Sequence, residues 1–240
     1  MKPTYEMPGV RLYLGDSAEV IPSLSDKFDL LVTDPPYGVA YQSSWREKVD
    51  QFDVIHGDRG EIDVAALLAA AVAKLHQKRH VYVFGPKEPV LACERLTGHV
   101  ELVWDKGRMT MGDLSTPWGP AHEAINFAVF VPSKAERAQG RGNLASRLRR
   151  GSVLHVPRID GNLLRHPNEK PVALVRQLVE SSSVVGDVVF DPFMGSGSTV
   201  IAALLAGRGA VGIERDPRYF DEARRRVDAL LPSLRLLESA

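Results

Sequence analysis

The chain has 240 residues, 44% of them apolar and 25% charged, a composition that excludes a disordered, collagen-like or coiled-coil protein. Thirty Lys and Arg residues balance thirty Asp and Glu residues, so the net charge gives no sign of a nucleic-acid partner. The single cysteine, Cys93, excludes an intramolecular disulfide framework and a cysteine-based zinc cluster. There is no apolar run long enough to cross a bilayer and no signal-peptide pattern, so we expect one cytoplasmic domain over residues 1–240 without a membrane partner.

Seven apolar runs bounded by turn residues are predicted as strands. In chain order they are Val10–Leu14, Phe28–Thr33, His80–Phe84, Val100–Trp104, Ala124–Val131, Asp187–Asp191 and Ala210–Ile213. Helical patterns are predicted at Ile62–Gln77, Lys87–Leu96, Pro171–Ser182, Ser198–Ala206 and Pro217–Leu231. Strands that alternate with helices favour an α/β fold, with a mostly parallel seven-stranded sheet and helices on both faces.

The basic residues are unevenly distributed along the chain. The segment Lys134–Arg176 holds ten Lys or Arg residues against three Asp or Glu residues, an excess of seven that leaves the remainder acidic by seven. Such a block fits either a phosphate-facing surface or a solvated loop. The least regular segments are Ala40–Gly60, Asp105–His122 and Lys134–Asn168, and loops of this length inside a domain are usually functional or mobile.

Four predicted strands are followed by an acidic residue, and ligands of a parallel sheet bind beyond the carboxyl ends of its strands. These acidic residues are Asp16, Asp34, Asp191 and Glu214. We therefore expect all four to lie at one edge of the sheet and to share one site.

A glycine loop follows Asp191. It lacks the Gly-Lys-Ser/Thr of a phosphate-binding P-loop, and Val200 stands where a dinucleotide fingerprint has its third glycine. Glu214 lies nineteen residues after Gly195, a distance at which an acidic residue typically bonds ribose hydroxyls. Together they favour a nucleoside ligand over the alternative, a structural strand–helix turn.

The motif Asp34-Pro35-Pro36-Tyr37 directly follows a predicted buried strand. Two successive prolines fix the backbone and remove N–H donors. The turn therefore presents a carboxylate and a carbonyl as fixed acceptors beside an aromatic ring. This combination suits a planar group that bears an NH2.

Three segments together resemble the amino-group DNA methyltransferases, which methylate adenine N6 or cytosine N4. These are Asp34–Tyr37, Asp191–Thr199 and His166–Pro171, with the catalytic motif ahead of the cofactor loop as in the family's beta group. The resemblance covers roughly Val10 to Val227, and it implies a single-domain Rossmann-like methyltransferase fold, S-adenosylmethionine as cofactor and double-stranded DNA as substrate. Asn168 and Ser198 depart from the family pattern, which commonly has Thr at both positions.

The resemblance also implies a role for each matching residue. The catalytic residues would be Asp34, Pro35, Pro36 and Tyr37. The cofactor-binding residues would be Asp16, His166, Lys170, Asp191, Phe193, Gly195, Gly197, Thr199 and Glu214, with no metal. Among them, Asp16 would meet the adenine, Glu214 the ribose and Lys170 the carboxylate of the cofactor.

In the mechanism that this implies, Asp34 and the Pro35 carbonyl accept the two N–H groups of an exocyclic amine, while Tyr37 stacks on the flipped base. Cys93 follows Ala92 in a predicted helix and lacks the Pro-Cys context of cytosine-C5 enzymes. An Asp at the first motif position is commoner in the adenine enzymes, so we expect N6 of adenine. The alternatives are N4 of cytosine, the same chemistry on RNA or a small amine, and a catalytically silent DNA-binding module.

The irregular segments are the expected DNA contacts. The candidate residues are Trp45, Arg46, Arg141, Arg147, Arg149 and Arg150, and we expect residues 134–165 to form a small DNA-recognition insert. The segment Arg108–Trp118 is a further candidate. Homodimers and companion restriction enzymes occur in the family, so both are expectations that the resemblance carries.

Overall fold

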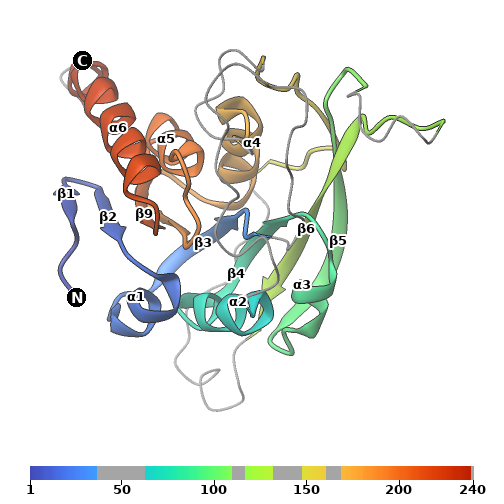
Figure 1. Cartoon of the computed structure of the whole chain (residues 1–240), viewed down its shortest axis with the longest axis horizontal. Coiled ribbons are helices and arrows are strands. Elements are labelled where there is room, and N and C mark those ends of the chain that lie inside the picture. The colour runs from blue at the N-terminus through green and yellow to red at the C-terminus, as the bar shows by residue number, and fades with distance from the viewer. Residues whose placement is uncertain (37–62, 110–116, 132–147, 161–168, 239–240) are drawn as a thin grey trace.

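The computed structural model describes residues 1–36, 63–109, 117–131, 148–160 and 169–238. Its strands form one nine-stranded sheet in the order β1-β2-β9-β8-β3-β4-β6-β5-β7 (Figure 1). The strands are β1 (Tyr5–Met7), β2 (Val10–Leu14), β3 (Phe28–Thr33), β4 (Leu75–Phe84), β5 (Leu96–Asp105), β6 (His122–Phe130), β7 (Val153–His155), β8 (Val188–Asp191) and β9 (Gly209–Glu214). The helices are α1 (Ser17–Ser23), α2 (Val64–Val72), α3 (Glu88–Ala92), α4 (Val172–Ser182), α5 (Ser198–Leu205) and α6 (Pro217–Glu238).

The sheet is mostly parallel, as the sequence predicts. Neighbouring strands are parallel from β2 through β9, β8 and β3 to β4, and β7 is parallel to β5. Only β1 and β6 run in the opposite direction. The expected count of seven strands is two too low, because β1 and β7 have three residues each and give too short a pattern to recognise.

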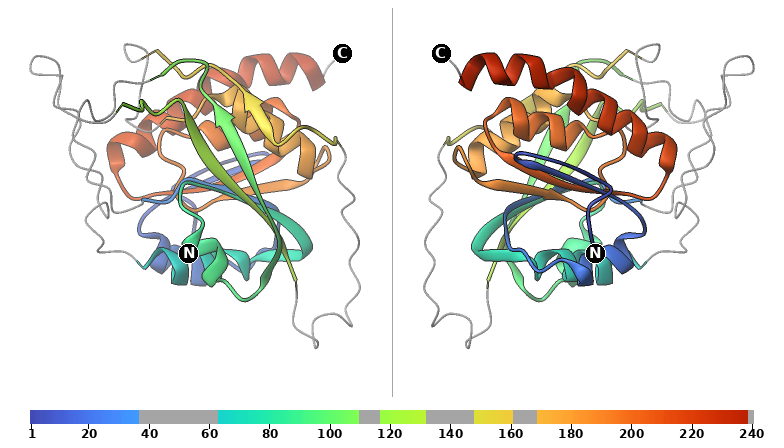
Figure 2. Two further views of the ribbon diagram at one scale, coloured as in Figure 1. Left: turned by 90° about the vertical axis from the view of Figure 1, so that its right-hand side faces the viewer. Right: turned by 90° about the vertical axis from the view of Figure 1, so that its left-hand side faces the viewer.

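Helices cover both faces of the sheet, as Figure 2 shows, with α4, α5 and α6 on one face and α1, α2 and α3 on the other. Alternate residues of β3 enter the two cores: Leu30 and Val32 pack on the side of α4, and Leu31 packs on the side of α2. This explains why the central strands are apolar throughout, since each has two buried faces. In the described part of the chain no helix is long and apolar enough to span a membrane.

The predicted helices differ from the structure in several bounds, and one helix was not predicted. The helix expected at Lys87–Leu96 spans only Glu88–Ala92, because β5 begins at Leu96. The helix expected at Ile62–Gln77 ends at Val72, and β4 begins at Leu75 instead of His80. The Ala- and Leu-rich run hides this boundary, because Leu75 pairs with Phe28 ahead of a register shift at which Lys78 adopts a φ of +57°. Helix α1 was missed because its short pattern contains Pro22, although Asp16 caps it by accepting the Ala18 N–H.

The parallel strands end together at one edge. Backbone hydrogen bonds fix their relative height, since Gly15 N–H donates to the Glu214 carbonyl and Met194 N–H donates to the Ile213 carbonyl, both at 2.9 Å. The loops after β2, β8 and β9 therefore emerge side by side, and the chemistry of the molecule is concentrated there.

Candidate functional site

A cavity of about 440 Å³ opens at the carboxyl edge of the sheet. Most of the predicted site residues that the structure describes line it. They are Asp16, Asp34, Pro35, Pro36, Lys170, Asp191, Phe193, Gly195, Thr199 and Glu214. The four acidic residues at the strand ends therefore line one cavity, as expected.

Asp34 is held by a buried lysine at this edge. Lys170 Nζ lies 2.7 Å from Asp34 Oδ2 and 3.2 Å from Glu123 Oε2. The same ammonium lies 5.2 Å from the centre of the Phe84 ring. The resemblance implies that Lys170 faces the cofactor carboxylate, and that role remains a prediction. In the structure its charge lies between two protein carboxylates.

The ion pairs of Lys170 shift its pKa and that of Glu123. Burial by itself would lower the pKa of Lys170, but the charges of Asp34 and Glu123 outweigh it and raise that pKa above its usual value. Burial likewise acts to raise the pKa of Glu123, and the neighbouring Lys170 and Lys106 bring it below its usual value instead. Both shifts favour the charged forms, an ammonium on Lys170 and a carboxylate on Glu123.

The glycine loop after β8 has a shape that requires glycine. Gly195 has a φ of +53° and Gly197 a φ of +85°, both in the left-handed region. Gly197 also touches α6, because a Cβ atom built on it would lie 2.9 Å from Ala223 Cβ. The loop thus lies close against α6, while Gly195 and Ser196 line the cavity.

Glu214 binds the glycine loop with one carboxylate oxygen and the loop after β9 with the other. Oε2 accepts the Gly195 N–H at 2.9 Å, and Oε1 accepts the Asp216 N–H at 2.7 Å. Burial raises the pKa of Glu214, and the backbone N–H groups partly offset that effect. A carboxylate has about four lone-pair positions, so Glu214 retains the capacity to accept a ligand hydroxyl beside its backbone N–H partners.

Asp191 connects the glycine loop to the catalytic strand. Its Oδ1 accepts the Thr33 hydroxyl at 2.9 Å and the Phe193 N–H at 3.0 Å. Burial raises the pKa of Asp191 to about 7, although the hydrogen bond from Thr199 opposes this rise. Its observed contacts are thus with the protein, and they join the residue before Asp34 to the loop after β8.

A second buried ion pair braces the other side of the loop. Arg226 Nη1 on α6 lies 3.0 Å from Glu169 Oε1, and the two side chains are 9% and 4% exposed. The same nitrogen donates to the Ser196 carbonyl at 2.7 Å. Arg226 thereby ties the glycine loop to the residue that precedes Lys170.

The comparisons with known proteins agree with this geometry. A family model described as DNA methylase, of the N6/N4 methyltransferases, matches residues 139–225. The chain is 26% identical over 269 residues to the type II methyltransferase M.ScaI of Streptomyces caespitosus, covering 97% of this chain and 86% of that relative. These matches bear out the resemblance to the amino-group DNA methyltransferases that the sequence motifs indicate.

Solved structures support the fold. The complex of M1.HpyAVI with SAM is similar with a TM-score of 0.65 at 19% identity, covering 90% of this chain and 99% of that one. The PvuII cytosine-N4-specific DNA methyltransferase gives a TM-score of 0.64 at 16% identity, covering 94% and 88%. The predicted α/β methyltransferase fold is confirmed. The M1.HpyAVI structure contains SAM, the cofactor that the resemblance predicts for this chain.

Several predicted site residues lie outside the described residues. They are Tyr37, Trp45, Arg46, Arg141, Arg147 and His166. Most of the expected recognition insert at 134–165 lies outside them as well. Their roles remain predictions.

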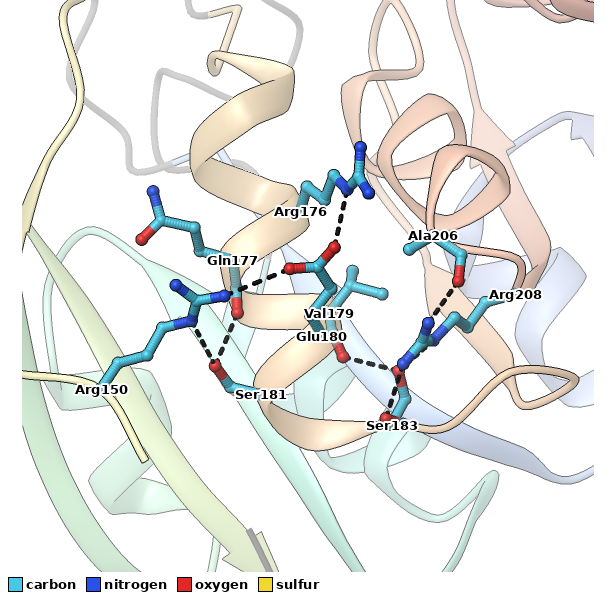
Figure 3. A network of polar contacts seen from close by, with 9 residues as sticks. All are labelled: Arg150, Arg176, Gln177, Val179, Glu180, Ser181, Ser183, Ala206 and Arg208. Carbon is cyan, nitrogen blue, oxygen red and sulfur yellow. Dashed lines mark hydrogen bonds and ion pairs between the residues drawn. The ribbon is translucent and has the colours of Figure 1, made fainter. Parts of the chain in front are cut away.

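The two described candidates for DNA contact lie away from the cavity lining. Arg149 is exposed. Arg150 forms an ion pair with Glu180 Oε2 at 3.2 Å and donates to Ser181 Oγ, also at 3.2 Å, as Figure 3 shows. Glu180 and Ser181 are at the C-terminal end of α4, whose opposite end follows Lys170.

The structure adds residues that the sequence analysis did not assign. Thr33, Lys106, Glu123, Glu169 and Arg226 contact the motif residues or one another. Glu169 lies inside the His166–Pro171 segment, so the sequence motif could have marked it as a site residue. The others come from distant segments, and only the fold brings them to the site.

We predict that Gly197→Ala destabilises the protein more than Gly186→Ala. Both glycines have a φ near +85°, at +85° and +88°, but a Cβ on Gly186 would meet nothing within 4 Å. The two variants therefore share the backbone strain, and only Gly197→Ala forces an overlap with Ala223. Chemical denaturation should give an extra loss of about 1–3 kcal/mol in the unfolding free energy. Equal losses would show that the loop does not need this close approach to α6.

We also predict that Arg226→Met lowers the unfolding free energy by about 3–5 kcal/mol, because Glu169 would remain buried without this partner. The matched control is Arg225→Met on the same helix. Arg225 is 66% exposed and pairs with Glu222, so its removal should cost less than about 1 kcal/mol. If calorimetry gave the two variants the same stability, the bracing role of Arg226 would be wrong.

Proposed function

We propose that this methylase transfers a methyl group from S-adenosylmethionine to N6 of adenine in double-stranded DNA. One observation carries the proposal: Asp34 and the glycine loop with Glu214 line the same cavity. One side can therefore hold an amine and the other a nucleoside cofactor. The choice of adenine depends on Asp34 as the first motif residue, since Asp is commoner there in adenine enzymes.

The cavity fits the cofactor in size and in chemistry. Its volume of about 440 Å³ lies within the range of small-molecule sites. In the proposed arrangement, Glu214 accepts the ribose hydroxyls, Asp16 meets the adenine, and Phe193 and the glycine loop border the methionine and ribose. Asp16 is also paired with Arg215 at 3.1 Å, and both residues line the cavity. When bound, S-adenosylmethionine supplies an electrophilic methyl group on a sulfonium ion.

The protein's part in the reaction is to position the amine. The lone pair of an exocyclic amine is delocalised into the ring, which makes the nitrogen a poor nucleophile. Asp34 and the Pro35 carbonyl would each accept one of its N–H groups, favour a pyramidal nitrogen and direct its lone pair at the methyl carbon. The N–CH3 bond would form as the S–CH3 bond breaks and the cofactor leaves as a neutral thioether, and the proton that the nitrogen loses would pass to the Asp34 carboxylate that accepts its N–H group.

A base inside a duplex does not reach a cavity of this kind, so the target base must be flipped at a cost of a few kcal/mol. We propose that Tyr37 stacks on the flipped base. We propose that Trp45, Arg46, Arg141, Arg147, Arg149 and Arg150 contribute to DNA binding, the arginines mostly at phosphates.

The runner-up is N4 of cytosine, which the fold resemblance does not discriminate against, because one of the similar structures is named as cytosine-N4-specific. The two activities give different products. Mixed-sequence DNA incubated with the protein and labelled cofactor, then digested to nucleosides, should contain N6-methyladenine. N4-methylcytosine would support the alternative, and unmodified DNA with bound cofactor would support a silent binding module.

We predict that Asp34→Ala lowers kcat by a factor of about 10²–10³ while cofactor affinity stays near the wild-type value, because Asp34 acts on the amine. Glu214→Ala should instead weaken cofactor binding. Calorimetry and steady-state methyl transfer measure the two effects separately. Asp26→Ala is a suitable control, since this carboxylate precedes the same strand, is 44% exposed and pairs with Arg11. Near-normal turnover of Asp34→Ala would contradict the assignment of the active site.

A further inference from the structure

Four charged side chains form a continuous chain of ion pairs that ends at Asp34. Lys106 Nζ lies 2.7 Å from Glu123 Oε1, Glu123 Oε2 lies 3.2 Å from Lys170 Nζ, and Lys170 Nζ lies 2.7 Å from Asp34 Oδ2. The members come from the ends of β5, β6 and β3 and from the segment before α4. Because β6 runs against β5, its first residues return to the same edge as the last residues of the parallel strands.

Lys170 is the member under the greatest constraint. Its side chain is 11% exposed, and its ammonium lies beside the Phe84 ring. Burying a cation costs desolvation free energy unless the cation is paired, so the Lys170 ammonium needs nearby carboxylates to offset that cost. Here the carboxylates of Asp34 and Glu123 both pair with the ammonium.

This division matters for Asp34. A carboxylate has about four lone-pair positions, and its strength as an acceptor falls as a nearby cation draws on its charge. If Asp34 alone neutralised the buried ammonium, it would accept an amine N–H less strongly. Glu123 neutralises part of the charge of the Lys170 ammonium, and its own carboxylate is held by an ion pair with Lys106.

We propose that Glu123 is a positioning residue of the methyl-transfer reaction, which acts through Lys170 to keep the Asp34 carboxylate oriented and able to accept the target amine. The inference deepens the proposed function and rests on it. Glu123 contacts neither cofactor nor base in this account. Lys106 has the subordinate role of holding the Glu123 carboxylate toward Lys170.

The test is Glu123→Gln, which keeps the shape of the side chain and removes its charge. We expect kcat for methyl transfer to DNA to fall about 10–100-fold, the range typical of losing an outer partner of a functional group. The cofactor Kd should change less than about twofold, since Glu214 and the glycine loop are untouched. Glu101→Gln is the matched control: it removes the same charge from an exposed position on neighbouring β5 and should leave kcat unchanged.

A double-mutant cycle separates positioning from a merely structural role. If Glu123 acts through Lys170, then Glu123→Gln should cost little further kcat in a Lys170→Met background, so the two effects should not add. Glu123→Asp retains the charge and should restore much of the kcat. If the Gln variant is unstable, the kcat of Glu123→Asp still tests the contact between residue 123 and Lys170. Additive effects, or a Glu123→Gln kcat equal to that of Glu101→Gln, would overturn the inference. Wild-type turnover in the same assay reports the proposed function independently.

Discussion

The hydrogen bonds of the Asp191 carboxylate connect the two halves of the site. One oxygen accepts both the Thr33 hydroxyl and the Phe193 N–H, so the strand that carries Asp34 and the glycine loop after β8 share an acceptor. Parallel neighbours make this contact available, because β3 and β8 pair directly and end together. The geometry between the proposed amine site and the proposed cofactor site is therefore set by a buried contact within the sheet.

Buried charge organises the remainder of the cavity. Lys170 is neutralised between Asp34 and Glu123, and Arg226 is neutralised by Glu169 while it holds the Ser196 carbonyl. The neighbouring residues Glu169 and Lys170 thus face opposite ways. Glu169 pairs with Arg226, which holds the glycine loop, and Lys170 pairs with Asp34 at the end of β3. Such pairs contribute little net stability compared with apolar packing, but they specify one arrangement of the loops. Methyl transfer by positioning and electrostatics depends on such fixed groups.

Much of this organisation could be predicted from the sequence. The α/β alternation, the parallel sheet and the gathering of Asp16, Asp34, Asp191 and Glu214 at one edge follow from local patterns and from the rule that ligands bind beyond strand ends. Contacts between segments distant in sequence could not be predicted. No local pattern indicates that Glu123, at the start of an antiparallel strand, returns to Lys170, or that Arg226 reaches Glu169 from α6. For the same reason the ion pairs of Lys170 with Asp34 and Glu123 could not be predicted, although the segment that holds Lys170 was recognised.

The central claim is that Asp34, held by Lys170, accepts an N–H of the target amine beside the bound cofactor. A crystal structure with a non-reactive cofactor analogue and a DNA duplex tests this most directly. The account predicts a flipped adenine with its N6 atom at hydrogen-bond distance, about 3 Å, from an Asp34 oxygen, and Lys170 still in contact with Asp34 and Glu123. A base amine directed elsewhere, or Lys170 turned away to the cofactor carboxylate, would contradict it.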